Sequence, residues 1–156
     1  MGIFAVTRED GISVIEIKNP PDVFGVAYCT FSSLADAGID VDLILQTTSV
    51  GHCGGIVFTV KDIEAAHSEE VLGSVFGDFP NTEIIIKNNA VKISISGVEM
   101  QGGVGVAAKV LKTLWREDIM IIGISTSEIK ISLLIDESYA SRAMKALLAE
   151  FELDAE

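Results

Sequence analysis

The stretch Gly25-Val26-Ala27 recurs eighty residues later as Gly105-Val106-Ala107, and this repeat decides the predicted fold. The same offset relates further apolar positions in the same order: Leu34 with Leu114, Ile39 with Ile119, Val41 with Ile121 and Ile44 with Ile124. Self-similarity at a fixed spacing is typical of a chain that contains repeated supersecondary units. We therefore expect two copies of one unit within the 156 residues.

The first copy is predicted to have the element order βαββαβ. Runs of β-branched and apolar residues predict strands, and apolar residues at the helical period predict helices. A glycine-rich turn is expected at 51–55. The expected strands and helices of this copy cover 12–17, 25–37, 41–48, 56–60, 63–76 and 82–87.

The second copy repeats this order but lacks a final strand. Its expected elements cover 91–96, 105–117, 121–125, 130–135 and 138–151, with Ser138 as the N-cap of the last helix. Ile3 to Thr7 is an apolar stretch without a place in the first copy, so we expect it to cross over and complete the second sheet. The predicted fold class is α+β, with one domain at 11–89 and the other at 90–156 plus 1–8.

Composition and charge exclude several classes of function. Asp and Glu outnumber Lys and Arg by 23 to 11, and the net charge of -12 would repel nucleic acid and anionic membranes. The longest apolar run, 119–124, is far too short to span a bilayer. Two cysteines cannot build a disulfide scaffold, and no signal peptide is visible at the start of the sequence. We expect a cytoplasmic protein.

Several stretches resemble one known family. They are 34–42 (Leu-Ala-Asp-Ala-Gly-Ile-Asp-Val-Asp), Gln46, 105–108 (Gly-Val-Ala-Ala) and above all 124–132 (Ile-Ser-Thr-Ser-Glu-Ile-Lys-Ile-Ser). Together they resemble the tandem ACT regulatory region of aspartate kinases over nearly the whole chain, while the nucleotide motif of the kinase half does not occur. The resemblance implies the separate regulatory β subunit of such a kinase, or a fragment covering that region.

The same resemblance implies a fold, an effector and partners. The fold is a pair of ferredoxin-like βαββαβ ACT domains, the second completed by the N-terminal strand. The effector is lysine or threonine, bound where ACT domains meet in a homodimer. The further partner is the aspartate kinase catalytic subunit, which the bound effector inhibits.

The residues themselves support an amino-acid site at the start of the first helix. A zwitterion needs donors for its carboxylate and acceptors for its ammonium group. Backbone N–H groups at Gly25, Val26 and Ala27 lie at the positive end of the helix dipole. Asp22 could accept from the ammonium group, and Gln46 offers both a donor and an acceptor. The resemblance also places effector contacts here; alternatively, Asp22 caps the helix, Gly25 ends a turn and Gln46 faces solvent.

The second copy differs from the first at this site. Gly102 takes the place of Asp22, so this copy lacks the carboxylate. The resemblance implies a complementary role, in which backbone groups around Met120 and Ile121 reach the site from the facing unit of a dimer; the alternative for their side chains is an ordinary buried strand. Ser127, in a polar turn between two apolar strands, either satisfies turn backbone or lines an effector or subunit contact.

Five positions depart from the common pattern of the family. Phe24 stands where proline is frequent, Gly54 and Gly55 where a Thr-Asp pair is usual, Ala107 at a frequent threonine and Met120 at a frequent asparagine. These departures leave open which amino acid binds. The alternative function is a structural ACT dimerisation module with a degenerate or altered effector site.

We expect neither catalysis nor a metal or cofactor site. His52-Cys53 is the only local pair of nucleophile and base, and adjacent side chains usually point apart. His67 lacks further metal ligands, and 102–105 (Gly-Gly-Val-Gly) lacks the spacing of a nucleotide-binding loop. The sequence therefore favours a non-catalytic sensor over a small hydrolase or transferase.

Overall fold

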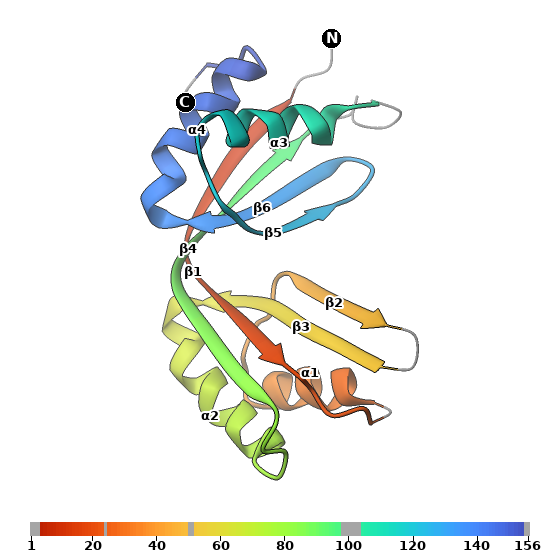
Figure 1. Cartoon of the computed structure of the whole chain (residues 1–156). Helices are drawn as coiled ribbons and strands as arrows, with labels where there is room; N and C mark the ends of the chain where they lie inside the picture. Colours follow the sequence, from red (N-terminus) through yellow and green to blue (C-terminus); the bar gives the residue numbers. More distant parts are fainter. Residues whose placement is uncertain (1–3, 24, 50–51, 98–103, 155–156) are drawn as a thin grey trace. The chain divides into compact units, whose positions relative to one another are not determined.

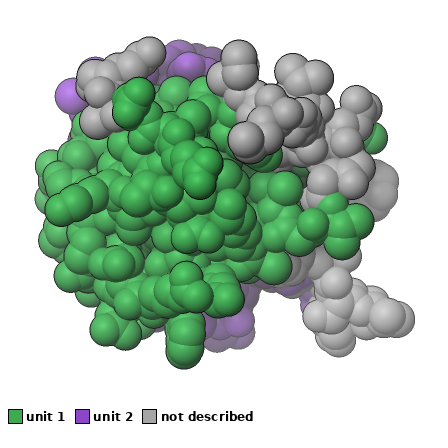
Figure 2. All heavy atoms as spheres, turned by 90° about the horizontal axis from the view of Figure 1, so that it is seen from above, with its two compact units in different colours: residues 1–10, 89–156 green, residues 11–88 purple. Residues whose placement is uncertain are grey.

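The computed structural model describes residues 4–23, 25–49, 52–97 and 104–154, with backbone alone at 47–49 and 52–53. The chain divides into two compact units, which Figure 2 colours separately. Unit 2 comprises Gly11–Asn88 and holds the first copy of the repeat. Unit 1 comprises Met1–Asp10 together with Asn89–Glu156 and holds the second copy.

Unit 2 is a βαββαβ fold in which two helices cover one face of the sheet (Figure 1). Its strand order is β2-β3-β1-β4, and β3 pairs antiparallel with both β1 and β2. In chain order it contains the second part of β1 (Ala5–Lys18), α1 (Val26–Asp36), β2 (Ile44–Ser49), β3 (His52–Lys61), the 3-10 turn η1 (Asp62–Glu64), α2 (Ala65–Phe76) and the first part of β4 (Glu83–Ser96). Its core is formed by buried apolar side chains from sheet and helices: Ile15, Ile17, Leu34, Ile56, Phe58, Leu72 and Phe76.

Unit 1 has the same architecture, with strand order β1-β4-β6-β5. It contains the first part of β1, the second part of β4, α3 (Val106–Arg116), β5 (Ile121–Thr126), β6 (Lys130–Asp136), the 3-10 turn η3 (Glu137–Tyr139) and α4 (Ala140–Glu150). Phe4 and Val6 pack against its core, so the N-terminal strand completes this unit. The predicted fold class, two ferredoxin-like units with the second completed in this way, is confirmed.

Sequence analysis divided β1 and β4 into two strands each, and this was wrong. Each is a single strand of 14 residues that is shared between the two units. The residues at the boundary are Gly11 and Asn89, with φ of 70° and 58°. Glycine and asparagine often interrupt strands, but they also adopt left-handed conformations at low cost. Here the strands continue past them.

The start of the last helix also differs from the prediction. Ser138 was expected to be its N-cap, but α4 begins at Ala140, after η3. Ser138 instead donates its backbone amide and its hydroxyl to Oδ1 of Asp136, at 2.9 and 2.6 Å. The Asp136 carboxylate therefore caps the 3-10 turn η3, while the N-cap residue of α4 is Tyr139, which makes no side-chain capping bond.

Candidate functional site

The start of α1 presents backbone donors, and its N-cap residue, Gly25, supplies no side-chain hydrogen bond to them. Gly25 precedes it with φ 84°, a left-handed conformation that glycine adopts without strain. The first helical hydrogen bond runs from the amide of Cys29 to the carbonyl of Gly25, at 2.9 Å. The Val26 amide donates to Val23 at 3.3 Å, and helix geometry gives the next amide, that of Ala27, no acceptor within the helix. These donors and the helix dipole favour a negatively charged group at this position.

Asp22 lies three residues before Gly25, Gln46 lies on β2, and both side chains are exposed. The N-cap residue of α1 is Gly25, and the alternative that the Asp22 carboxylate caps this helix stays a prediction. Gln46 lies on β2, the edge strand of unit 2, opposite Ile56 of β3. Unit 2 thus carries, on exposed side chains, a carboxylate and an amide, which are groups that can accept from an ammonium group. Their roles as effector contacts stay predictions.

The second copy repeats the helix start without the carboxylate. Gly105 precedes α3 with φ 92°, and the Lys109 amide donates to its carbonyl at 2.9 Å. Gly105, the N-cap residue of α3, likewise supplies no side-chain hydrogen bond. Ala107 is half-buried and packs against the core of unit 1. The two helix starts are thus alike in backbone geometry.

Met120 and Ile121 lie in unit 1, whereas the other candidates for the helix-start site lie in unit 2. Met120 is 76% exposed, so the expectation of an ordinary buried strand is wrong for this side chain. Ile119 turns inward and is buried, and the next side chain along an extended chain points the opposite way. Ile121 begins β5 and packs, half-buried, against the core.

Ser127 closes the turn between β5 and β6. Its amide donates to the Lys130 carbonyl at 2.8 Å, and its hydroxyl lies 3.4 Å from the same oxygen. The structure thus contains the turn-stabilising contact that was one of the two expectations. Because Ser127 is exposed, its contact with an effector or a second subunit stays a prediction.

The hairpin in unit 2 is longer than its counterpart in unit 1. Ile44 pairs with Phe58, while the equivalent Ile124 pairs with Leu133, so the second hairpin is five residues shorter. The glycine-rich turn expected at 51–55 was wrong, because β3 already begins at His52, which pairs with Ser49. Glycine occurs both in the turn of a hairpin and inside its strands, so the number of glycines alone does not show where the turn lies. Gly54 and Gly55 are therefore strand residues.

The structure adds no support for a catalytic or metal-binding role of the two histidines and Cys53. His67 is exposed on α2, and the side chains of His52 and Cys53 lie outside the described parts, as does Phe24. In the part of the chain that the structure describes, no three His, Cys, Asp or Glu side chains are placed to hold a metal ion. No helix within the described ranges is long and apolar enough to cross a membrane.

Sequence analysis missed an exposed apolar surface on α3. Trp115 is 75% exposed and Leu111 is 38% exposed, and their spacing of four residues places them on one helix face. The charged residues of α3 are all cations: Lys109, Lys112 and Arg116. The corresponding helix α1 carries one charge, that of Asp36. Comparison of the two copies position by position would have revealed this difference.

Known proteins are similar to this chain in sequence and fold. A family model of the ACT domain matches residues 93–151. The regulatory subunit of aspartate kinase from Thermus thermophilus, solved in its ligand-free form, is 31% identical, with a TM-score of 0.86 and coverage of 97% of both chains. A chain in a crystal structure of aspartokinase alpha and beta subunits is 37% identical, with a TM-score of 0.85 and coverage of 95% of this chain and 97% of that one.

Curated relatives are longer proteins. The aspartate kinase of Pseudomonas fluorescens (strain SBW25) is 37% identical over 141 residues, which cover 90% of this chain and 34% of the relative. The aspartokinase of Helicobacter pylori (strain 26695) is 34% identical over 153 residues, which cover 98% of this chain and 36% of the relative. The chain therefore spans about a third of the length of these curated relatives.

Proposed function

Since this chain belongs to the family of aspartate kinase regulatory subunits, built from ACT domains without catalytic machinery, we propose that it binds lysine or threonine and so inhibits a catalytic chain. The ACT domains are proposed to follow the repeat, at 11–89 and at 90–156 plus 1–8. The observation that carries this proposal is the start of α1 behind the left-handed Gly25, an N-cap residue that supplies no side-chain hydrogen bond. A regulatory subunit needs a site for its signal, and this helix start fits an α-carboxylate.

The proposed contacts follow from the two charges of an amino acid. Its carboxylate accepts from the Ala27 amide and its neighbours in the first turn of α1. Its ammonium group donates to the carboxylate of Asp22 and the amide oxygen of Gln46, both of them on exposed side chains. Gly25 has no heavy atom within 4 Å of the position a Cβ would take, so the approach to the backbone is open.

A second chain is proposed to complete the site. Unit 2 carries 3 Lys and Arg against 11 Asp and Glu, whereas α3 of unit 1 carries three cations and no acid. Opposite charges favour docking of unit 1 of one chain against unit 2 of another. Trp115 and Leu111 supply exposed apolar area on the same helix as these cations. Such a homodimer would bring Met120, Ile121 and Ser127 of one chain toward the helix start of the other.

Regulation then follows from linkage. An amino acid that binds better to one arrangement of the paired ACT units shifts the population toward that arrangement. A catalytic chain attached to those units would change its activity with them. The relative solved as alpha and beta subunits supports such a pairing of chains for this family.

The sensor is tested by thermal melting of the purified chain against each of the amino acids. A ligand at 100 times its dissociation constant stabilises by about 2.7 kcal/mol, which corresponds to roughly 5–10 °C here. We expect a shift with lysine, threonine or both. Asp22→Ala should abolish it, and Asp40→Ala, which removes another exposed carboxylate of unit 2, should not. A folded dimer that no amino acid shifts would favour the structural dimerisation module instead.

The pairing is tested separately by sedimentation at several protein concentrations. Trp115→Lys should weaken self-association by about tenfold or more, because it places a charge in a proposed apolar contact. Ala35→Lys makes a similar change at the equivalent, exposed position of α1 in unit 2 and serves as the matched control. Equal self-association of both variants and the unmodified chain would contradict docking through α3.

A further inference from the structure

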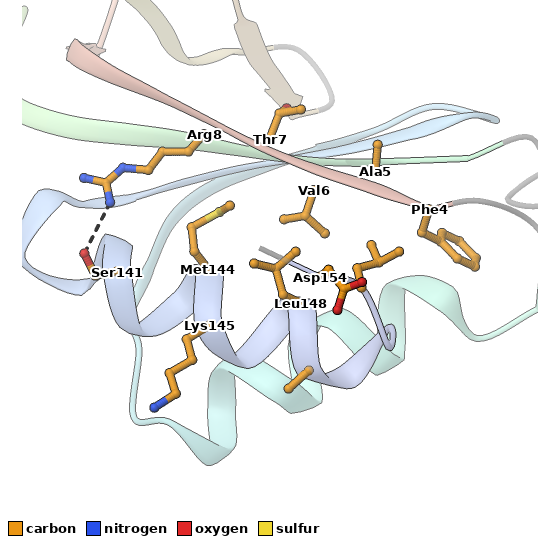
Figure 3. Close-up of a pocket in the computed structure, with 12 residues that line it drawn as sticks. Phe4, Ala5, Val6, Thr7, Arg8, Ser141, Met144, Lys145, Leu148 and Asp154 are labelled. Carbon is orange, nitrogen blue, oxygen red and sulfur yellow. Dashed lines mark hydrogen bonds between the residues drawn. The ribbon is translucent and has the colours of Figure 1, made fainter. Parts of the chain in front are cut away.

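A groove of about 930 Å³ runs along the outer edge of unit 1, between the start of β1 and α4 (Figure 3). Figure 3 shows Val6 of β1 facing Met144 and Leu148 of α4 across the groove. Phe4 and Asp154, from the two ends of the described chain, also line it. Neither the proposed effector site nor the proposed homodimer uses this region.

The strand that forms one side of the groove has a free edge. In unit 1 the order β1-β4-β6-β5 leaves β1 at the margin of the sheet. On its other side β1 pairs with β3 only over residues 12–17, which belong to unit 2. Among the described residues, 5–10 therefore have no strand on their outer side. Such an edge presents backbone N–H and C=O groups that an added strand can pair with.

The groove supplies apolar contacts along that edge. Phe4, Val6, Met144 and Leu148 are all half-buried, so each packs inward and still exposes part of its surface. An added strand points every second side chain toward the same face of the sheet. Backbone pairing with the edge and apolar side chains in the groove are together the features of strand addition.

We propose that this groove receives an extended segment of the kinase catalytic chain, which adds a strand to the edge of β1 and places apolar side chains against Val6, Met144 and Leu148. The proposal rests on the proposed function, because it requires a catalytic chain as partner. It concerns a surface at the opposite edge of unit 1 from β5. The segment is defined by its chemistry: extended, and apolar at alternate positions.

The position of the chain ends identifies this occupant. In the curated relatives the matched region is about a third of the polypeptide, so the remaining two thirds join it at one or both of its ends. In this structure residues from both ends, Phe4 and Asp154, line the groove. The rest of such a relative therefore leaves the ACT region beside this groove. A separate catalytic chain that binds in this groove would lie where the remaining part of the longer relatives leaves the ACT region.

A second copy of this chain fits the groove less well. Twofold antiparallel pairing of residues 5–10 with themselves places Val6 of each copy opposite Glu9 of the other, so the apolar side chain of the groove meets a carboxylate and gains no apolar partner. Arg8 also already pairs with Asp10 at 2.8 Å and donates to Ser141 at 3.3 Å. The exposed Trp115 on α3 offers a more suitable contact surface for a second copy of the chain than this groove does.

The test is hydrogen exchange of the full chain, alone and in complex with its purified catalytic chain. We expect amides within residues 5–8 to exchange about tenfold more slowly or better in the complex, because an added strand protects a free edge. Met144→Lys and Leu148→Lys should each weaken the complex by about tenfold and remove this protection. Ile63→Lys, the same kind of change at a residue of unit 2 that is 86% exposed, should do neither. All three variants should keep the amino-acid-induced melting shift.

Other outcomes would overturn the proposal in distinguishable ways. A complex that forms without protection at 5–8 would refute the groove and leave the regulatory function intact. Protection that appears in the chain alone and grows with its concentration would identify a second copy as the occupant. A catalytic chain that does not bind at all would refute both the groove and the proposed partner, while the melting shift would still report on effector sensing. The exchange of the unmodified complex decides the matter even where a variant fails to fold.

Discussion

Helices α1 and α3 share their backbone geometry and differ in the charges they carry. Each follows a left-handed glycine, and each ends with a hydrogen bond of 3.0 Å to an equivalent leucine carbonyl: Ile39 to Leu34, and Ile119 to Leu114. Yet α1 carries only the charge of Asp36, and α3 carries three cations. Helix ends and buried positions constrain the backbone, while exposed positions do not. The repeat therefore maintains a scaffold on which the two copies can take different roles.

The two units differ again in how one edge strand of each sheet is attached, namely β4 in unit 2 and β1 in unit 1. In unit 2 that strand, the first part of β4, follows α2 in the chain. In unit 1 it comes from the other end of the sequence and is held to the unit by strand pairing and side-chain contacts. These include the Phe4 and Phe151 rings at 5.0 Å, Arg8 with Ser141 at 3.3 Å, and Glu9 with Lys92 at 2.9 Å. The strand of unit 1 should thus be the easier one to release.

The largest expected effect comes from the equivalent core leucines. Leu34→Ala and Leu114→Ala should each lower the free energy of unfolding by about 2–5 kcal/mol, because both side chains are fully buried. Urea unfolding measures this. A cost below about 1 kcal/mol in either copy would contradict two equally packed cores. Two separate transitions would show that the units unfold independently.

A smaller effect is expected where the strand attachment differs. Phe4→Ala should cost about 1–2 kcal/mol, since it removes a ring contact and part of the half-buried packing on unit 1. It should also speed amide exchange over residues 5–10. Ile84→Ala, in the corresponding strand of unit 2, should leave exchange in its strand much less affected, because that strand is joined to α2 by a short connection. Equal release of both strands would contradict the comparison.

The helix starts offer a third test. Gly25→Ala and Gly105→Ala should each cost about 1–2 kcal/mol, because alanine is strained at φ 84° or 92° while its Cβ meets no atom within 4 Å. Their effects on the amino-acid-induced melting shift should differ. Gly25→Ala narrows the approach to the proposed site and should reduce the shift, whereas Gly105→Ala should preserve it. The opposite result would place the effector at α3.

The smallest expected effect concerns the residue after each helix. Gly38 and Asp118 occupy equivalent positions with φ of 75° and 53°. Gly38→Ala should destabilise by about 1 kcal/mol, and Asp118→Gly should stabilise by about 0.5 kcal/mol, because only glycine adopts this conformation without strain. Thermal melting compares the two changes. Destabilisation by Asp118→Gly would show that the Asp118 side chain makes a contact that outweighs the strain.

Most of the fold could be predicted from the sequence. The repeat and the apolar periodicity located α1, α2, α3 and α4, the four α-helices of the described residues. The second copy lacked a final strand and the N-terminus had an extra one, which together predicted the crossover. What failed were the ends: the cap at Ser138, the turn at 51–55 and the division of β1 and β4. Caps and turns depend on single hydrogen bonds and dihedral angles, which leave only a weak trace in local composition.

The candidate site was predictable in part. The apolar period indicated a helix from Gly25 onward, and the left-handed conformation of that residue, with φ 84°, came from the structure. The exposure of Met120 and Trp115 and the groove beside β1 could not be read from the sequence. An apolar residue looks the same in a sequence whether it points into the core or out of it.

The sequence by itself determined two βαββαβ units, their acidity and the family to which they belong, because these follow from which residue types recur and how often. Only the tertiary structure decided which apolar side chains stay uncovered and which strand edge stays unpaired. Those properties depend on what lies across from each residue in space. For the proposed regulatory subunit, the exposed surface of α3 and the β1–α4 groove are the places to test for partners.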